Sequence, residues 1–205
     1  MQPFDELLKE SVALHGHLCP GQVIGVRMGM VGCMLVGVDD PLHSKKLIVY
    51  VEIDRCATDA IQSVTGCKLG KRTLKYLDYG KMAAAFLNTQ TGAAFRVVAR
   101  DDARQRAYAY APPGASRQEA QLQGYTVMPQ DELFVVTPVR LDVPQEDQPG
   151  HPVSRVECEA CGEGVNDRRE VRQGQRVLCR ACAFGAYYQP VQEAKPELAM
   201  TPRRR

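Results

Sequence analysis

The sequence has almost no excess of charge of either sign. Its 205 residues contain 26 Lys and Arg against 24 Asp and Glu, a formal net charge of +2. Dedicated nucleic-acid-binding proteins are usually strongly basic, so the composition argues against that class. A chain of this length that is 44% hydrophobic predicts one domain of ordinary size with a small appendage.

Long hydrophobic runs are also missing. The longest apolar stretch, Val23 to Val38, has 16 residues, contains Arg27 and is interrupted by four glycines, so it falls short of a membrane span. The first ten residues carry Asp5 and Glu6 ahead of the first lysine and lack the basic and apolar regions of a secretory signal. We therefore expect a cytoplasmic protein with no membrane segment.

The motifs of several common catalytic classes are absent as well. The sequence contains no phosphate-binding loop, no dinucleotide fingerprint, no recognisable Ser-His-Asp set and no internal repeat. The chemistry therefore has to be sought among its eight cysteines and four histidines.

Four of the cysteines form two Cys-x-x-Cys pairs, Cys158 with Cys161 and Cys179 with Cys182. The 17 residues between the pairs give the spacing of a zinc ribbon, in which four thiolates close a tetrahedral structural site. A module of about 35 residues has too little core to fold without such a metal clip. The alternatives are two disulfides or a redox Cys-x-x-Cys, but neither explains the duplication.

The residues around these cysteines carry a resemblance. Segments 158–163 and 178–182 resemble the DksA/TraR-type C4 zinc finger. Arginines and acidic residues alternate through this region, which favours a solvated surface of mixed charge over a phosphate-binding face. Nucleic acid is therefore not the expected partner, and a steep salt dependence of binding would be the sign of it.

Hydrophobic periodicity predicts an α+β domain ahead of the finger. Helices are expected over 4–15, 23–35, 57–64 and 116–124, and antiparallel strands over 47–53, 73–79, 82–89, 93–99 and 133–137. The second helix carries a stripe of small residues, Gly25, Gly29, Gly32 and Cys33, which lets another element approach its backbone closely.

Composition divides the chain into four parts. We expect the α+β domain at 1–142, a Pro-rich linker at 143–153, the C4 zinc finger at 154–189 and a disordered tail at 190–205.

Potential metal ligands also cluster near the N-terminus. His15, His17 and Cys19 lie within five residues, and Cys56 falls in the first turn of a predicted helix, where the dipole favours thiolate. We hypothesise a three-ligand site of His17, Cys19 and Cys56 with an exchangeable fourth position. His15 and Asp59 are supporting or alternative ligands. The competing interpretation is a cleft of hydrogen-bonded thiols and imidazoles without metal.

Two nearby residues have simpler interpretations. Lys71 follows a glycine in a turn and could reach the cleft to stabilise an anion, although an exposed loop lysine is the alternative. Cys67 is eleven residues beyond Cys56, roughly 16 Å along a helix, so it cannot share an ion with Cys56 and is expected to be structural.

The N-terminal motifs together resemble one family. The segments His15–Gly21, Asp54–Gln62, Thr65–Lys71 and Asp78–Lys81 resemble FmdE, the family named after a component of formylmethanofuran dehydrogenase. The resemblance implies an α+β domain whose His, Cys and second Cys line one cleft, with a C-terminal zinc finger appended in some members. It also implies proteins encoded with, or related to, a molybdenum enzyme of one-carbon metabolism.

Three functional hypotheses follow. The first is a metal-dependent enzyme or accessory factor linked to molybdenum formylmethanofuran dehydrogenase or related one-carbon metabolism. The second is a non-enzymatic zinc-finger adaptor or regulator that binds protein or nucleic acid, and the third is a metal carrier. The expected cofactors are structural zinc and a second transition metal, and the expected partners are a second copy of the chain, as a homodimer, and components of the molybdenum enzyme. Two ions per chain favour the first or third hypothesis, and one favours the second.

Overall fold

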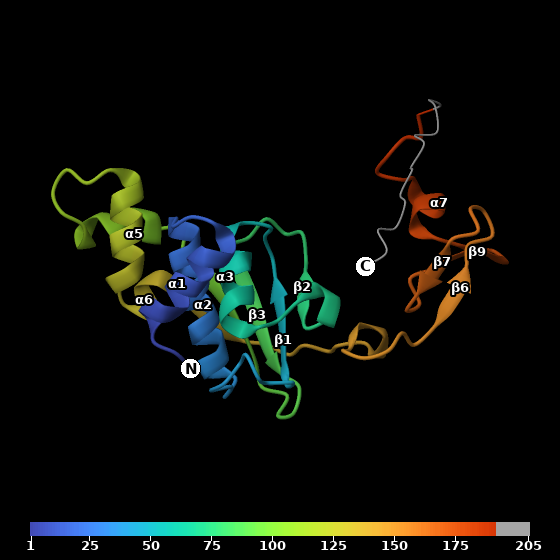
Figure 1. The fold of residues 1–205 in the computed structure, drawn as a ribbon, viewed down its shortest axis with the longest axis horizontal. Coiled ribbons are helices and arrows are strands. Elements are labelled where there is room, and N and C mark those ends of the chain that lie inside the picture. Colours follow the sequence, from blue (N-terminus) through green and yellow to red (C-terminus); the bar gives the residue numbers. More distant parts are fainter. Residues whose placement is uncertain (192–205) are drawn as a thin grey trace, which may run out of the picture. The chain divides into compact units, whose positions relative to one another are not determined.

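The computed structural model describes residues 1–191, and contacts divide the chain into two units, Met1–Gly150 and His151–Arg205 (Figure 1). The predicted linker, 143–153, spans the boundary between the units. The tail predicted to be disordered, 190–205, lies almost wholly outside the described residues. Among residues 1–191, no helix has both the length and the hydropathy that a membrane crossing requires.

The first unit is built on a five-stranded sheet in the order β2-β1-β3-β4-β5. Its strands are β1 (Leu47–Val51), β2 (Leu74–Tyr76), β3 (Ala83–Asn88), β4 (Ala94–Ala99) and β5 (Phe134–Pro138). All neighbours pair antiparallel except β1 and β2, which are parallel because the chain between them crosses over through a helix. The predicted α+β class is confirmed, with this one parallel pair as an addition.

Helices cover the sheet and fill the connections between its strands. In the first unit these are α1 (Phe4–His15), α2 (Pro20–Leu35), α3 (Cys56–Thr65), α4 (Ala103–Arg106), α5 (Arg117–Val127) and α6 (Gln130–Leu133), with the 3-10 turns η1 (Leu69–Lys71), η2 (Ala107–Tyr110) and η3 (Gln145–Asp147). The first three helices pack against one another, and α2 also contacts β3 and β4 (Figure 1). Helix α2 begins three residues earlier than predicted because Pro20 is accommodated in its first turn.

Glycines let α2 pack closely on its neighbours. A Cβ at Gly25 would lie 2.5 Å from the carbonyl oxygen of Ala57 in α3, and one at Gly32 would overlap the ring of Phe86 in β3. Such separations are shorter than any ordinary contact, so only glycine fits at these positions. The predicted close approach along the small-residue stripe is confirmed, and it brings the start of α3 against the start of α2.

A buried polar link joins the same three helices. Gln22 of α2 is fully buried, and its side-chain oxygen accepts a hydrogen bond from the hydroxyl of Ser11 in α1. Its amide Nε2 donates to the carbonyl oxygen of Cys56, the first residue of α3, at 2.6 Å. Because unsatisfied polar groups are costly in a core, this link fixes the three helices in one register.

The sheet contains a buried ion pair. Arg96 of β4 donates to both carboxylate oxygens of Glu52, just beyond β1, at 2.6 and 2.7 Å. The Glu52 side chain is 7% exposed and that of Arg96 is 30% exposed. The pair therefore bridges the strands on either side of β3 in a largely dry environment.

The second unit consists of two short hairpins and one helical turn. Strands β6 (Arg155–Glu157) and β7 (Gly164–Asn166) form one hairpin, and β8 (Val171–Gln173) and β9 (Arg176–Leu178) form the other. Helix α7 (Arg180–Phe184) follows directly. Each strand has only three residues, so regular structure alone cannot hold this unit together.

Candidate metal centres

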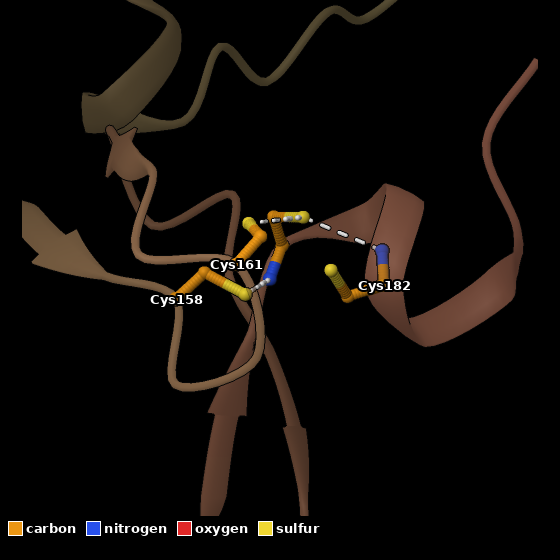
Figure 2. Close-up of side chains that lie close together, drawn as sticks. Cys158, Cys161 and Cys182 are labelled. Carbon is orange, nitrogen blue, oxygen red and sulfur yellow. Dashed lines mark hydrogen bonds between the residues drawn. The ribbon is translucent and has the colours of Figure 1, made fainter. Parts of the chain in front are cut away.

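The four C-terminal cysteines converge on one point (Figure 2). Cys158 and Cys161 lie in the turn between β6 and β7, while Cys179 precedes α7 and Cys182 lies within it. All four sulfurs are within 4.8 Å of one another, and those of Cys161 and Cys179 are 3.9 Å apart. The two Cys-x-x-Cys pairs therefore form a single site, as their spacing predicts.

This donor set fits a structural zinc ion. Zn–S bonds of about 2.3 Å in a tetrahedron place the sulfurs about 3.8 Å apart, close to the spacing found here. The backbone N–H of Cys179 donates to the sulfur of Cys158 at 3.1 Å, and that contact, with the Cys161 amide, lowers the pKa of Cys158 to about 6. The adjacent Cys179 and Cys161 sulfurs raise the pKa of Cys182 to about 12, a crowding that a cation among the four would relieve.

A second cluster forms where α1 gives way to α2. His15 is the last residue of α1, and Gly16 has φ 96°, a left-handed conformation that ends the helix and turns the chain back. Cys19 is the N-cap of α2. As a result, ligand atoms of His15, His17 and Cys19 all lie within 4.8 Å of one another, and the two imidazole centroids are 4.6 Å apart.

His15 has the hydrogen bonding of a metal ligand. Its Nδ1 lies 2.8 Å from a carboxylate oxygen of Asp59 in α3, which favours the tautomer with the proton on Nδ1 and the lone pair on Nε2. Nε2 is buried and has no hydrogen-bond partner among residues 1–191. A buried, unpaired imidazole nitrogen beside a second imidazole and a thiol fits a bound cation.

Cys56 lies close to the Cys19 thiol. A Cβ built on Gly21 would be 2.8 Å from Cβ of Cys56 and 3.6 Å from the sulfur of Cys19, so the backbone of Gly21 lies against both cysteines. Burial, followed by a hydrogen bond with Cys19, raises the pKa of Cys56. This is contrary to the expectation that its place in the first turn of α3 would favour thiolate, because desolvation outweighs the helix dipole.

Two family models match this chain, one in each of its two units. Residues 14–135 match the family described as FmdE, molybdenum formylmethanofuran dehydrogenase operon. The chain belongs to the FmdE family. Residues 152–188 match the prokaryotic dksA/traR C4-type zinc finger, so both resemblances inferred from the sequence are confirmed.

Two individual proteins resemble this FmdE-family chain over most of its length. An Archaeoglobus fulgidus protein named "Probable S-adenosyl-L-methionine-binding protein" is 28% identical, with 89% of this chain and 53% of the relative aligned. The chain therefore spans about half the length of that curated relative. The crystal structure of a tungsten formylmethanofuran dehydrogenase FmdE-like protein from Syntrophus aciditrophicus has 22% identity and a TM-score of 0.57, covering 91% of this chain and 95% of that one. This likeness shows a shared fold.

The FmdE-family unit has a cleft beside the second cluster. His15, Cys56 and Asp59 line an open cavity of about 460 Å³, together with Asp54. Its apolar wall comes from Val51, Ile53, Leu69, Leu74 and Tyr76. Two carboxylates, a thiol, an imidazole and Arg55 therefore line a space large enough for a small organic molecule.

The other predicted residues lie elsewhere in the FmdE-family unit. Lys71 is exposed in η1 and is not among the described residues that line this cavity. Cys67 is buried, and its thiol contacts the carbonyl oxygen of Leu47 at 3.7 Å, in agreement with a structural role. Cys33 is also fully buried, and burial raises its pKa to about 12.

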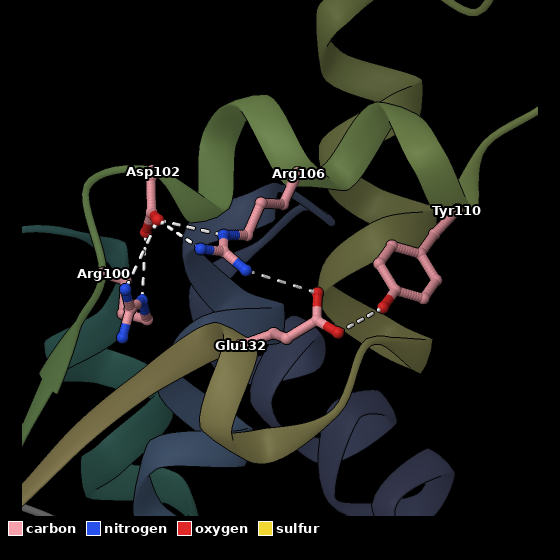
Figure 3. Close-up of polar contacts among 5 residues, drawn as sticks. All are labelled: Arg100, Asp102, Arg106, Tyr110 and Glu132. Atoms are coloured by element: carbon pink, nitrogen blue, oxygen red, sulfur yellow. Dashed lines mark hydrogen bonds and ion pairs between the residues drawn. The ribbon is translucent and has the colours of Figure 1, made fainter.

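Sequence reasoning missed a polar network around the short helices that follow β4. Asp102 accepts hydrogen bonds from Arg100 and Arg106, which lower its pKa to about 2 (Figure 3). Arg106 also lies 4.0 Å from Glu132, which accepts a 3.0 Å hydrogen bond from the hydroxyl of Tyr110 (Figure 3). The network ties α4 and η2 to α6, and its irregular spacing along the chain offers no periodic signal.

Proposed function

We propose that the N-terminal unit binds a transition metal through His15, His17 and Cys19, with Cys56 as an exchangeable fourth ligand. The observation that carries this proposal is the buried Nε2 of His15, which has no partner among the described residues while Asp59 holds its Nδ1. Compared with the site hypothesised from the sequence, His15 becomes a ligand and Asp59 its support. Mixed imidazole and thiol ligands suit zinc, iron, nickel or copper.

The cleft lined by His15, Cys56 and Asp59 would give a substrate access to the proposed metal ion. A metal with an exchangeable position can activate water or polarise a bound carbonyl group. The chain's own residues divide the remaining work: Asp59 orients His15, the apolar wall excludes water from part of the cavity, and Cys56 borders the space where a substrate would sit. The site accordingly supports a metal-dependent enzyme or accessory factor.

The biochemical context comes from relatives. The matching family is described by the molybdenum formylmethanofuran dehydrogenase operon, and the structural neighbour is named for the tungsten enzyme. We therefore propose that this chain serves formylmethanofuran dehydrogenase or a related step of one-carbon metabolism, in contact with components of the molybdenum enzyme. Its zinc finger exposes Phe184, Tyr187 and Tyr188, aromatic side chains suited to a protein partner, and we propose a second copy of the chain as one such partner.

Metal content tests the proposal. We expect two metal ions per wild-type chain, and a loss of one ion in His15→Gln because the imidazole lone pair disappears from the cluster. His43→Gln is the matched control, since His43 also bonds a carboxylate, that of Asp40, but its side chain is 83% exposed and outside both clusters. Elemental analysis of the purified proteins measures the stoichiometry, and Cys19→Ser should repeat the loss.

One outcome favours a different class of function. A single ion in the wild-type chain, unaffected by His15→Gln and Cys19→Ser, would refute the second centre and favour a zinc-finger adaptor or regulator. A second ion that exchanges freely with a chelator while the first stays bound would favour a metal carrier.

S-adenosylmethionine is a candidate ligand for the cleft beside the proposed metal site. The name of the Archaeoglobus relative suggests it. The cavity offers the carboxylates of Asp54 and Asp59 to the cationic sulfonium, with Tyr76 in the same lining, and Arg55 to the carboxylate of the ligand. Calorimetric titration is expected to show binding that weakens about tenfold in Asp54→Asn, a change of roughly 1.4 kcal/mol. Absence of heat in the wild-type protein would remove this candidate.

A further inference from the structure

A separate cavity of about 240 Å³ lies at the N-terminal end of α2. Its lining includes Pro20 and Gly21, the first two residues of that helix. Arginines from three places in the chain line the cavity: Arg100 after β4, Arg104 in α4 and Arg117 at the start of α5. None of these three arginines belongs to the cluster or the cleft described above.

The charge inside this cavity is unbalanced. Arg100 is held by Asp102, whereas the side chains of Arg104 and Arg117 are exposed and make no hydrogen bond or ion pair with another residue in 1–191. The acidic residue in the lining is Asp101. Because Asp102 pairs with Arg100, the excess positive charge at the cavity comes from Arg104 and Arg117, set against the one lining carboxylate of Asp101, and this excess favours an anion.

A buried tyrosine adds a donor. Tyr125 of α5 is 3% exposed and lines the cavity, and its hydroxyl has no hydrogen bond to any described residue. Burial raises the pKa of Tyr125, while the positive charges of Arg104 and Arg117, which line the same cavity, act in the opposite direction. The hydroxyl is therefore free to donate to a molecule bound in the cavity.

Hydrogen bonds from Arg27 fix the backbone at Tyr125. Arg27 of α2 donates to the backbone carbonyl oxygens of Tyr125 and Met128 at 2.8 and 2.7 Å, which attaches the end of α5 to α2. The tyrosine and the start of α2 therefore face the cavity from one rigid framework, and a ligand would find its donors already in place.

We propose that this cavity binds the phosphate group of a small molecule. Guanidinium groups bind phosphate through paired N–H donors, the Tyr125 hydroxyl adds a further donor, and the N-terminal end of the 16-residue helix α2 favours negative charge. A phosphate has enough acceptor oxygens to engage all of these donors at once, whereas a single carboxylate has two.

One residue, Gly21, connects the cavity with the thiols. Gly21 lines it and at the same time lies against both Cys19 and Cys56. Neither cysteine lines this cavity, so a phosphorylated substrate of the proposed metal centre would have to extend past Gly21 to reach the sulfurs. That link to a substrate rests on the proposed function, but anion binding itself does not.

Titration of the full chain with inorganic phosphate at constant ionic strength tests the site. We expect saturable binding by calorimetry, weakened about tenfold or more in Arg104→Gln and in Arg117→Gln, since each removes a charge-assisted contact. Tyr125→Phe should weaken binding less, because it removes one neutral donor. Arg140→Gln is the control: Arg140 is 86% exposed and paired with Asp142, and its loss should leave phosphate affinity unchanged.

Three results would overturn the assignment. They are no saturable phosphate binding, an equal loss of affinity in Arg140→Gln, or tighter binding of succinate than of phosphate, which would assign the cavity to carboxylates. Arg117→Lys separates charge from paired hydrogen bonding and should retain only part of the affinity. Cys56→Ser should bind phosphate normally, so failure of the metal proposal is distinguishable from failure of this one.

Discussion

Replacing Cys179 with serine is expected to abolish zinc binding by the C-terminal unit and to unfold it, while the first unit stays folded. The reason is the near absence of a core. Of the described hydrophobic residues in this unit, the buried ones are Cys158 and Leu178, and one of these is itself a ligand. Structural zinc in small fingers supplies about 10–16 kcal/mol, far more than two short hairpins can provide.

The measurement combines elemental analysis with NMR spectra of the backbone amides. The wild-type chain should show dispersed signals for the finger that collapse in Cys179→Ser and on treatment of the wild type with a strong chelator. Arg180→Gln is the matched control, since Arg180 is exposed on α7 between the two ligands at that helix. A Cys179→Ser protein with full zinc content and dispersed finger signals would contradict the assignment.

Arg96→Met should produce the second large effect, a destabilisation of the first unit by about 3 kcal/mol. The substitution keeps the apolar stem of the side chain but leaves the Glu52 carboxylate, which is 7% exposed, without its two donors. Removing one member of a buried pair costs about 3–5 kcal/mol, and the partial exposure of Arg96 places this case at the lower end.

Urea unfolding measures the change, and a double variant separates its causes. Glu52→Leu combined with Arg96→Met removes both charges, so its free energy of unfolding should recover most of the loss seen in Arg96→Met. If Arg96→Met alone were as stable as the wild type, the ion pair would contribute nothing to the sheet.

The elements that the sequence predicts well are those with local signals. Helix α1 has the bounds expected from its apolar spacing, and α5 begins after Ser116, whose hydroxyl and the Glu119 carboxylate form a reciprocal cap. The short helices α4 and α6 were missed, since four residues are too few to establish a period. The parallel pairing of β1 with β2 depends on the crossover through α3, which no single segment encodes.

The candidate sites follow the same rule. Each Cys-x-x-Cys pair, like the group of His15, His17 and Cys19, consists of residues close in sequence. Their spacing alone is therefore enough to predict them as candidate ligands. The contact between His15 and Asp59 spans 44 residues and depends on how α1 packs against α3. Arg104 and Arg117 look like ordinary surface arginines in the sequence, and only the folded chain brings them to Tyr125.

The buried link through Gln22 has a consequence for the metal site that we propose in the N-terminal unit. Hydrogen bonds from Ser11 to Gln22 and from Gln22 to Cys56 join the helices that carry His15, Cys19 and Cys56. These helix ends are thereby aligned in the ion-free chain, so ion binding at the proposed site would cost little chain entropy. On this proposal, the fold sets the spacing of the ligand atoms in advance, and a substitution of Gln22 would broaden the range of ionic radii that the site accepts.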